Sequence, residues 1–302
     1  MHLPLKTAWR LAKEAVTSWV DDYGQSMGAA LAYYTVFSLA PLLLIVISVA
    51  GLVFGPDAAR GEILTELQGM MGEDAAHAVQ GLLESTNQPK TGTVATLIGA
   101  IMLLVGATTV FAELQTSLDR IWRVPAQTSS GIWSLLRTRF LSFGMILGIG
   151  FLLMVSLIFS AMLSALENWW EPWFRGWATL ASVVNQVASF GLTTAAFAMI
   201  YKIMPRARIQ WPDVWVGAAV TAALFTVGKY LIGLYIGKSG VTSVFGAAGS
   251  LVVVLVWVYY SAQIFLIGAE FTWVYAHQIG SRKGQPRPGA AEPVPSRHLK
   301  AA

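Results

Sequence analysis

Six long apolar stretches constrain this chain more than any other feature of its sequence. They run over about residues 28–55, 94–112, 140–165, 178–201, 214–237 and 247–271. A helix needs about 20 mostly apolar residues to cross the roughly 30 Å hydrocarbon core of a bilayer, because each residue adds about 1.5 Å. The sequence therefore predicts an all-α, polytopic membrane protein built on a bundle of six transmembrane helices.

The composition favours the same class and argues against an enzyme. Of the 302 residues, 55% are hydrophobic and only 12% are charged, whereas soluble domains carry about 25% charged residues. Cysteine is absent, and the four histidines are scattered along the sequence without ligand spacing. We expect no catalytic residue, no metal and no cofactor.

The basic residues predict the orientation of the spans. Fifteen of the 20 lysines and arginines fall in the N-terminal arm, in the loops after the second and fourth spans, and in the tail. Cytoplasmic segments carry such an excess of positive charge, so both termini are expected in the cytoplasm. The predicted organisation is a cytoplasmic arm over 1–27, a membrane domain over 28–277, and a disordered tail over 278–302 that is rich in proline, glycine and basic residues.

Two segments outside the spans have helical periodicity. In residues 5–20 one helical face is apolar and the others carry basic residues; the apolar face consists of Leu5, Ala8, Trp9, Ala12, Val16, Trp19 and Val20. This amphipathic pattern suits a helix on the anionic inner leaflet, or alternatively a helix that packs on a cytoplasmic loop. Residues 56–93 predict two short helices separated at Gly72, with apolar positions over 63–83 available to a partner. The acidic residues of this outer loop form a solvated face or, alternatively, bind a cation.

A polar layer is predicted below the outer ends of the spans. Lys229 and Gln186 each lie eight residues from such an end, which is about 12 Å at the helical rise. Ser156 and Ser48 fall at comparable depth on the third and first spans. If these side chains face inward, the layer offers one cation to an anionic head group. The alternative is that Lys229 extends outward along its aliphatic stem to reach the surface.

Glu113 and Glu270 define a second layer near the cytoplasmic ends of their spans. Charge inside a span is costly and normally faces a partner or a cavity. The basic residues nearest in depth are Arg120, Arg123, Arg206 and Arg208. We expect structural salt bridges, with proton coupling as the alternative.

Proline and glycine add weaker signals. Pro41 lies near the middle of the first span and is expected to kink that helix without ending it. Small-residue pairs suited to close helix contact occur at Gly51 and Gly55, Gly144 and Gly148, and Gly233 and Gly237. They serve packing within one chain or between two, so a homo-oligomer stays open.

Three sequence blocks resemble the YihY/BrkB family of bacterial inner-membrane proteins. They are residues 30–44 (ALAYYTVFSLAPLLL), residues 111–122 (FAELQTSLDRIW), and the run from Gly246 to Phe271. The blocks occur in family order, and the resemblance covers about residues 10–277. It implies six spans in the bacterial inner membrane. The matched positions without an assigned role are Tyr33, Tyr34, Pro41, Glu113, Trp122, Tyr260 and Glu270.

The resemblance implies no settled activity, because members have been labelled ribonuclease BN or virulence factors and transport has been suspected. We therefore expect a transporter or flippase of an amphipathic, anionic, lipid-like substrate, with membrane lipids as partners. The alternative is a non-catalytic scaffold or partner protein of the cell envelope. RNA cleavage requires positioned acid and base groups that RNA can reach. The short basic loops offer none, so we expect neither ribonuclease activity nor nucleic-acid binding.

Overall fold

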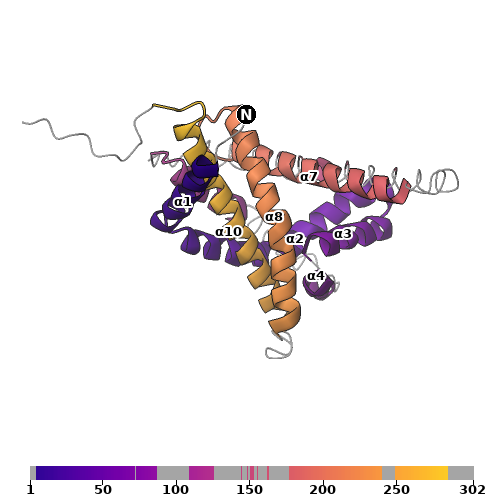
Figure 1. The fold of residues 1–302 in the computed structure, drawn as a ribbon. Helices are drawn as coiled ribbons and strands as arrows, with labels where there is room; N and C mark the ends of the chain where they lie inside the picture. The colour runs from indigo at the N-terminus through magenta and orange to yellow at the C-terminus, as the bar shows by residue number, and fades with distance from the viewer. Residues whose placement is uncertain are drawn as a thin grey trace, which may run out of the picture.

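The computed structural model describes residues 5–71, 73–86, 109–125, 177–239 and 249–284, with isolated positions between 144 and 162. Within these ranges the regular structure is helical and no strand occurs. The helices are α1 (Leu5–Asp21), α2 (Gly24–Phe54), α3 (Pro56–Met71), α4 (Glu73–Thr86), a helix over 109–121, α7 (Trp177–Ile203), α8 (Trp211–Ser239) and α10 (Gly249–Gln278) (Figure 1). The predicted all-α class is confirmed.

Three of these helices are long and apolar enough to cross a membrane. The spanning segments are Ser182–Ile203, Trp211–Ile236 and Leu251–Gln278, and they correspond to the fourth, fifth and sixth predicted spans. The first predicted span lies within α2, which continues through Pro41 without a break. Most of 94–112 and 140–165 lies outside the described residues. The count of six spans therefore stays a prediction.

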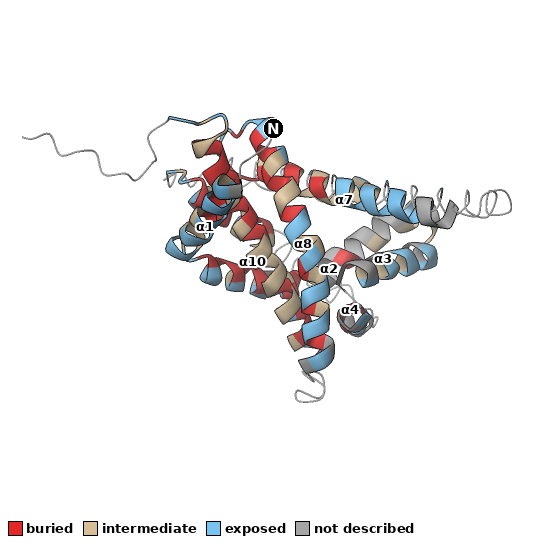
Figure 2. Cartoon of the chain, in the orientation of Figure 1, coloured by how far each residue is buried: buried red, intermediate tan, exposed pale blue. Residues whose placement is uncertain are grey.

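Large apolar side chains cover the outside of these helices. Exposed examples on α7, α8 and α10 are Val183, Val187, Phe190, Leu224, Val227, Tyr230, Leu231, Leu234, Tyr235, Leu251 and Leu255. Figure 2 shows α7 mostly in the exposed colour over 182–191, and the second half of α8 with exposed turns between intermediate and buried ones. Water disfavours an apolar surface of this extent, and lipid does not. The exterior is that of a membrane protein.

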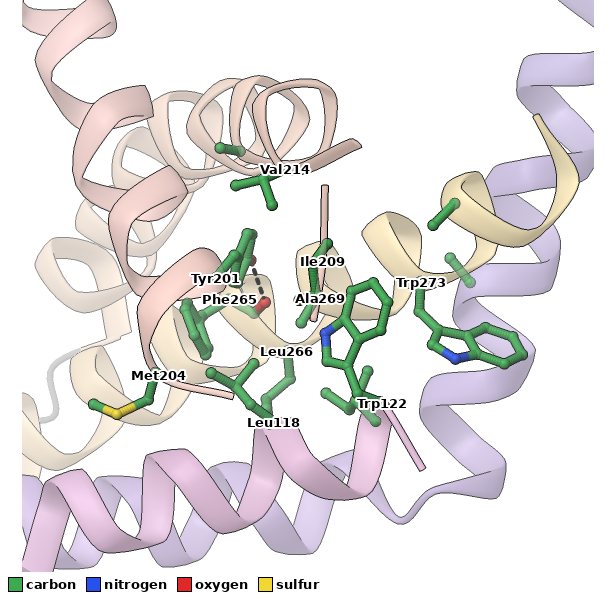
Figure 3. Close-up of a cluster of buried hydrophobic side chains, with 14 of the residues drawn as sticks. Leu118, Trp122, Tyr201, Met204, Ile209, Val214, Phe265, Leu266, Ala269 and Trp273 are labelled. Atoms are coloured by element: carbon green, nitrogen blue, oxygen red, sulfur yellow. Dashed lines mark hydrogen bonds between the residues drawn. The ribbon is translucent and has the colours of Figure 1, made fainter. Parts of the chain in front are cut away.

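Helix α10 is the centre of the described fold. It packs against α8, α2, α1 and α4, and nearly all of its second half is buried. The core at that half combines α10 with α7, α8 and the helix over 109–121, and Figure 3 shows Leu118, Tyr201, Leu266 and Trp273 converging there. A second core, which includes Val79, Leu83, Val253 and Val254, fills the other half.

Helices α8 and α10 approach closely through two reciprocal glycine–threonine contacts. A Cβ on Gly217 would lie 1.8 Å from Thr272 Oγ1, and a Cβ on Gly268 would lie 2.0 Å from Thr221 Oγ1. Each threonine hydroxyl donates to the glycine carbonyl four residues earlier in its own helix, over 2.8 Å for Thr221 and 2.7 Å for Thr272. Gly217 and Gly268 allow the close approach of α8 to α10, and among the predicted pairs Gly148 is packed so that a Cβ would lie 2.9 Å from Met199 Sδ. Gly233 and Gly144 face open space among the described atoms.

The helices predicted in the loop after the first span are present as α3 and α4, divided at residue 72. Their apolar face is not free for a partner, however. Ala76, Val79 and Leu83 are buried, and α4 packs against α2 and α10. The expectation of an exposed apolar surface over 63–83 was wrong for α4, because this hairpin folds back onto its own bundle.

Candidate functional site

Charged and aromatic side chains gather at the end of the bundle where α1 meets the last turns of α10. Four parts of the chain come together there: the turn between α1 and α2, the segment 109–125, the α7–α8 loop, and residues 279–284 after α10. We call this region the junction. It contains most of the polar contacts that the described residues make over long sequence distances.

The centre of the junction is a carboxyl cluster formed by Asp22, Arg123 and Glu270. Glu270 projects from α10 and is only 1% exposed. Asp22 lies in the α1–α2 turn, and its Oδ2 is 3.7 Å from Arg123 Nη2. Asp22, Arg123 and the nearby Asp21 act electrostatically on the Glu270 carboxyl. Three segments far apart in sequence thus place the buried Glu270 and the partly buried Asp22 beside one cation.

The Glu270 carboxyl has no hydrogen-bond donor among the described residues, since neither of its oxygens is bonded. The carboxyl of Asp22 lies near enough to act electrostatically on that of Glu270, but no hydrogen bond joins the two groups. Two carboxylates repel each other, and a hydrogen bond between two carboxyl groups requires a proton on one of them. Arg123 contributes a single positive charge beside these carboxyl groups.

Aromatic rings hold the arginines of the junction in place. The guanidinium of Arg123 lies 5.0 Å from the ring centre of Trp273, and that of Arg282 lies 5.1 Å from the ring centre of Trp122. Arg120 lies 5.2 Å from the ring centre of Tyr23. Tyr23 itself adopts a left-handed backbone conformation with φ of 59°. These cation–π contacts join segment 109–125 to α10, to the tail and to the α1–α2 turn.

Segment 109–125 also holds the α7–α8 loop. The buried Gln115 amide donates to the Met204 carbonyl over 3.1 Å. Asp119 accepts the Arg206 backbone N–H over 2.7 Å, and its other oxygen is 3.6 Å from Arg206 Nε. Burial raises the pKa of Asp119 above its ordinary value, although the N–H and the charge of Arg206 both act to lower it. The loop between two candidate spans is therefore tied to a third segment.

The tail after α10 closes the junction. Asp213, buried in the first turn of α8, accepts the backbone N–H of Ser281 over 3.2 Å. Arg282 donates to the Arg208 carbonyl over 2.9 Å. Gly280 is packed so closely that a Cβ there would lie 2.2 Å from an Asp213 oxygen. The helix dipole stabilises the negative charge of Asp213 at the N-terminus of α8. The hydrogen bond from Ser281 to Asp213 fixes the start of α8 to the segment after α10.

The predicted layer of Glu113 and Glu270 is only partly brought together. Glu270 faces Arg123, one of the four arginines predicted from depth. Glu113 is half-buried on the helix over 109–121, and the described residues form no ion pair with it. Tyr33 is exposed on α2, and its ring centre is 5.4 Å from that of Tyr34. Neither tyrosine reaches the carboxyl cluster through a recorded contact.

The predicted polar layer around Lys229 stays a prediction. Lys229 is half-buried on α8, with its ammonium 5.4 Å from the ring centre of Tyr230. Gln186 is exposed on the part of α7 that diverges from α8 (Figure 1). The side chains of Ser48 and Pro41 and the whole of Ser156 lie outside the described residues.

Two residues with long-range polar contacts in this part of the fold were not anticipated from the sequence. Asp22 lies before the first span, and only the sharp α1–α2 turn carries it to Glu270. Gln263 on α10 accepts from Trp19 Nε1 over 3.1 Å and donates to the Gln25 carbonyl over 3.4 Å. An amide in the middle of an apolar stretch is the signal that identifies such a residue, because a polar group there needs partners.

Comparison with known proteins decides the family. The family model described as Virulence factor BrkB matches residues 15–292. The chain belongs to this family. That range includes the complete carboxyl cluster, so the junction lies within the part of the BrkB chain that the family shares.

Relatives of this BrkB family protein are named as membrane proteins. A UPF0761 membrane protein of Pseudomonas paraeruginosa is 28% identical over 275 residues, covering 89% of this chain and 64% of the relative. That of Tolumonas auensis is 28% identical over 246 residues, covering 80% and 77%. A UPF0761 membrane protein of Pseudomonas aeruginosa PAO1 is 29% identical over 255 residues, which cover 83% of this chain and 59% of the relative. The chain thus spans about 60% of the length of its Pseudomonas relatives. No solved structure matches.

Proposed function

We propose that this BrkB family protein is a proton-linked transporter of an amphipathic, anionic, lipid-like molecule in the bacterial inner membrane. The observation that carries the proposal is the buried Glu270 carboxyl, which faces a second carboxyl across a helix junction. A buried acid is expensive inside a membrane protein and commonly marks a proton pathway. A scaffold or an anchor has no need of one.

The cluster supplies a mechanism in which one proton alters helix contacts. With a proton, the Asp22 and Glu270 carboxyls share a hydrogen bond, and the α1–α2 turn stays on α10. Without it, two carboxylates face a single Arg123 and repel each other, which favours separation of the turn from α10. A proton taken up on one side and released on the other thereby biases the bundle between two arrangements.

The anionic character of the substrate follows from the charge available in the candidate spans. Lys229 is half-buried within the segment Trp211–Ile236, and a cation at that depth attracts an anionic head group. The apolar exterior of α7, α8 and α10 lets the acyl part of a lipid-like substrate remain in the bilayer while its head group moves. The distribution of basic residues favours a cytoplasmic position for both termini.

The proposal is tested by reconstituting the protein in liposomes and following the translocation of labelled phosphatidylglycerol and labelled phosphatidylcholine. We expect faster movement of phosphatidylglycerol than in protein-free vesicles. Lys229→Gln should reduce that movement at least threefold while leaving phosphatidylcholine unchanged. Lys238→Gln, at the exposed end of the same helix, is the matched control and should behave as the unaltered protein.

Equal rates with and without protein for both probes would contradict a lipid transporter. That outcome would favour the second candidate, a non-catalytic membrane scaffold. The specific observation behind this candidate is the exposed apolar face on the first turns of α7, which includes Val183, Val187 and Phe190. The transport proposal includes no enzymatic activity and no nucleic-acid binding.

A further inference from the structure

Helix α1 presents a basic and apolar surface that no described part of the chain covers. We propose that this surface binds the anionic head groups of the bilayer, so that α1 is a lipid-binding helix fixed to the side of the bundle. The inference is independent of transport. It concerns where the first helix lies and which lipid it contacts.

One face of α1 is fixed to the protein. Leu11 and Ala15 are fully buried, and α1 packs against α10. Trp19 Nε1 donates to Gln263 Oε1 over 3.1 Å, and Glu14 accepts from the Gln278 amide. These contacts hold α1 at several positions along its length. Rotation of the helix about its axis would therefore expose Leu11 and Ala15. Its other faces therefore have a defined direction.

The outward face is apolar. Trp9 is 73% exposed, Val16 48% and Val20 57%. At about 100° per residue these three side chains fall within a stripe about 40° wide. Leu11 and Ala15 lie on the opposite part of the helix circumference. The face predicted from the sequence as apolar is thus divided: Trp19 packs on the protein, whereas Trp9, Val16 and Val20 are not covered by the described residues.

Cations border the apolar stripe on one side. Lys13, Lys6 and Arg10 follow it around the helix at about 20–80° from Val20, and all three are exposed. Long basic side chains beside an exposed tryptophan allow the stem to contact acyl chains while the charge contacts phosphate. This combination matches an anionic membrane surface better than an acidic protein, which would not require the apolar stripe.

The position of α1 along α10 places this face beside a candidate membrane span. Gln263 lies 15 residues before the end of the candidate span Leu251–Gln278, which is about 22 Å along the helix. The Trp19–Gln263 bond therefore puts the end of α1 beside the spanning segment and not beyond it. A helix held beside a span at this level meets lipid on its free side.

Because the chain contains no cysteine, single nitroxide labels can report on this face in the full-length protein. The labelled variants are Val16→Cys, in the stripe, and Thr17→Cys, the exposed neighbour about 100° away. In nanodiscs with phosphatidylglycerol and phosphatidylcholine, the Val16 label should be more accessible to oxygen than to a water-soluble nickel complex. The Thr17 label should show the reverse order. A Lys6→Glu, Lys13→Glu background tests the charge, and it should remove any increase in oxygen accessibility that phosphatidylglycerol produces at Val16.

Equal exposure of both labels to the nickel complex in every bilayer would overturn the proposal, because the stripe would then face water. Low accessibility of the Val16 label to both oxygen and the nickel complex would also overturn the proposal, since a protein surface would then cover the stripe. If phosphatidylglycerol raises the oxygen accessibility of the Val16 label equally in the charge-reversed background, the proposed binding of anionic head groups would be refuted. None of these readouts depends on transport, so the failure of one proposal does not imply the failure of the other.

Discussion

At the scale of single residues, Glu270 shows how this fold accommodates an acid inside an apolar core. The carboxyl is buried beside Asp22 and Arg123, and the arginine is itself held against Trp273. A neutral isostere keeps the shape and the hydrogen-bonding capacity of a protonated acid, whereas loss of the arginine leaves two acids without a nearby cation. Substitutions at these two positions should therefore differ in their effect on stability.

We predict that Glu270→Gln folds with nearly unchanged thermal stability, because the amide can donate to Asp22 as a protonated carboxyl does. Arg123→Ala should lower the free energy of unfolding by about 1 kcal/mol, a modest value because the arginine is partly exposed to solvent. Thermal unfolding in detergent near neutral pH checks both. A Glu270→Gln variant that is less stable than Arg123→Ala would show that the carboxyl is ionised and favourably paired.

Asp119 gives a prediction about pH. Its pKa is raised, chiefly by burial, so the folded protein binds the proton more tightly than the unfolded chain does. The stabilisation from this proton is present at low pH and is lost as the pH rises through the folded-state pKa. Relative to the unaltered protein, Asp119→Asn should therefore gain stability as the pH increases across the carboxyl range. Parallel thermal unfolding curves at several pH values test this, and a relative loss of stability on raising the pH would contradict it.

At the scale of elements, the α8–α10 crossing depends on the reciprocal pairing of glycine with threonine. Gly217 faces Thr272 and Gly268 faces Thr221, and the hydroxyls are satisfied within their own helices. Close packing of small residues is the main attraction between helices in lipid, where there is no hydrophobic driving force between them. An added methyl group at this crossing therefore acts directly on helix association.

We predict that Gly217→Ala destabilises the fold by roughly 1–3 kcal/mol, the usual cost of overpacking. The matched control is Gly233→Ala on the same helix, where the new methyl group meets open space and should be neutral or slightly stabilising. The double variant Gly217→Ala, Thr272→Gly exchanges the small and large partners and should recover much of the loss. Thermal unfolding of the three variants checks this, and equal effects of the two single variants would refute the proposed crossing.

At the scale of the whole molecule, the junction brings both ends of the described chain to the same end of the bundle. Helix α1 packs on α10, and residues 281 and 282 bond to Asp213 and to the α7–α8 loop. An impermeant maleimide should therefore modify Lys6→Cys and Lys283→Cys from the same side of the membrane. The distribution of basic residues predicts that this side is the cytoplasm. Modification of the two positions from opposite sides of oriented vesicles would contradict the fold.

Much of this arrangement could be predicted from the sequence, and its failures have physical causes. The lengths of the apolar stretches predicted the positions of α2, α7, α8 and α10. Counting residues from the span ends identified Arg123 among the arginines available to Glu270. Asp22 could not be predicted, because its place depends on the α1–α2 turn at Tyr23 and not on any periodicity. The glycine pairs spaced by four residues did not identify the α8–α10 crossing, for a similar reason. Spacing shows that two glycines share a face, but only the partner helix determines which face is packed.

The central claim is that the carboxyl cluster couples proton movement to transport, and translocation of labelled phosphatidylglycerol under an imposed pH gradient tests it most directly. The gradient should accelerate translocation in liposomes that contain the unaltered protein. Glu270→Gln should abolish the acceleration, and Glu113→Gln, an acid outside the cluster, should retain it. An equal response to the gradient in all three proteins would contradict the account, as would a rate that does not depend on the gradient in the unaltered protein.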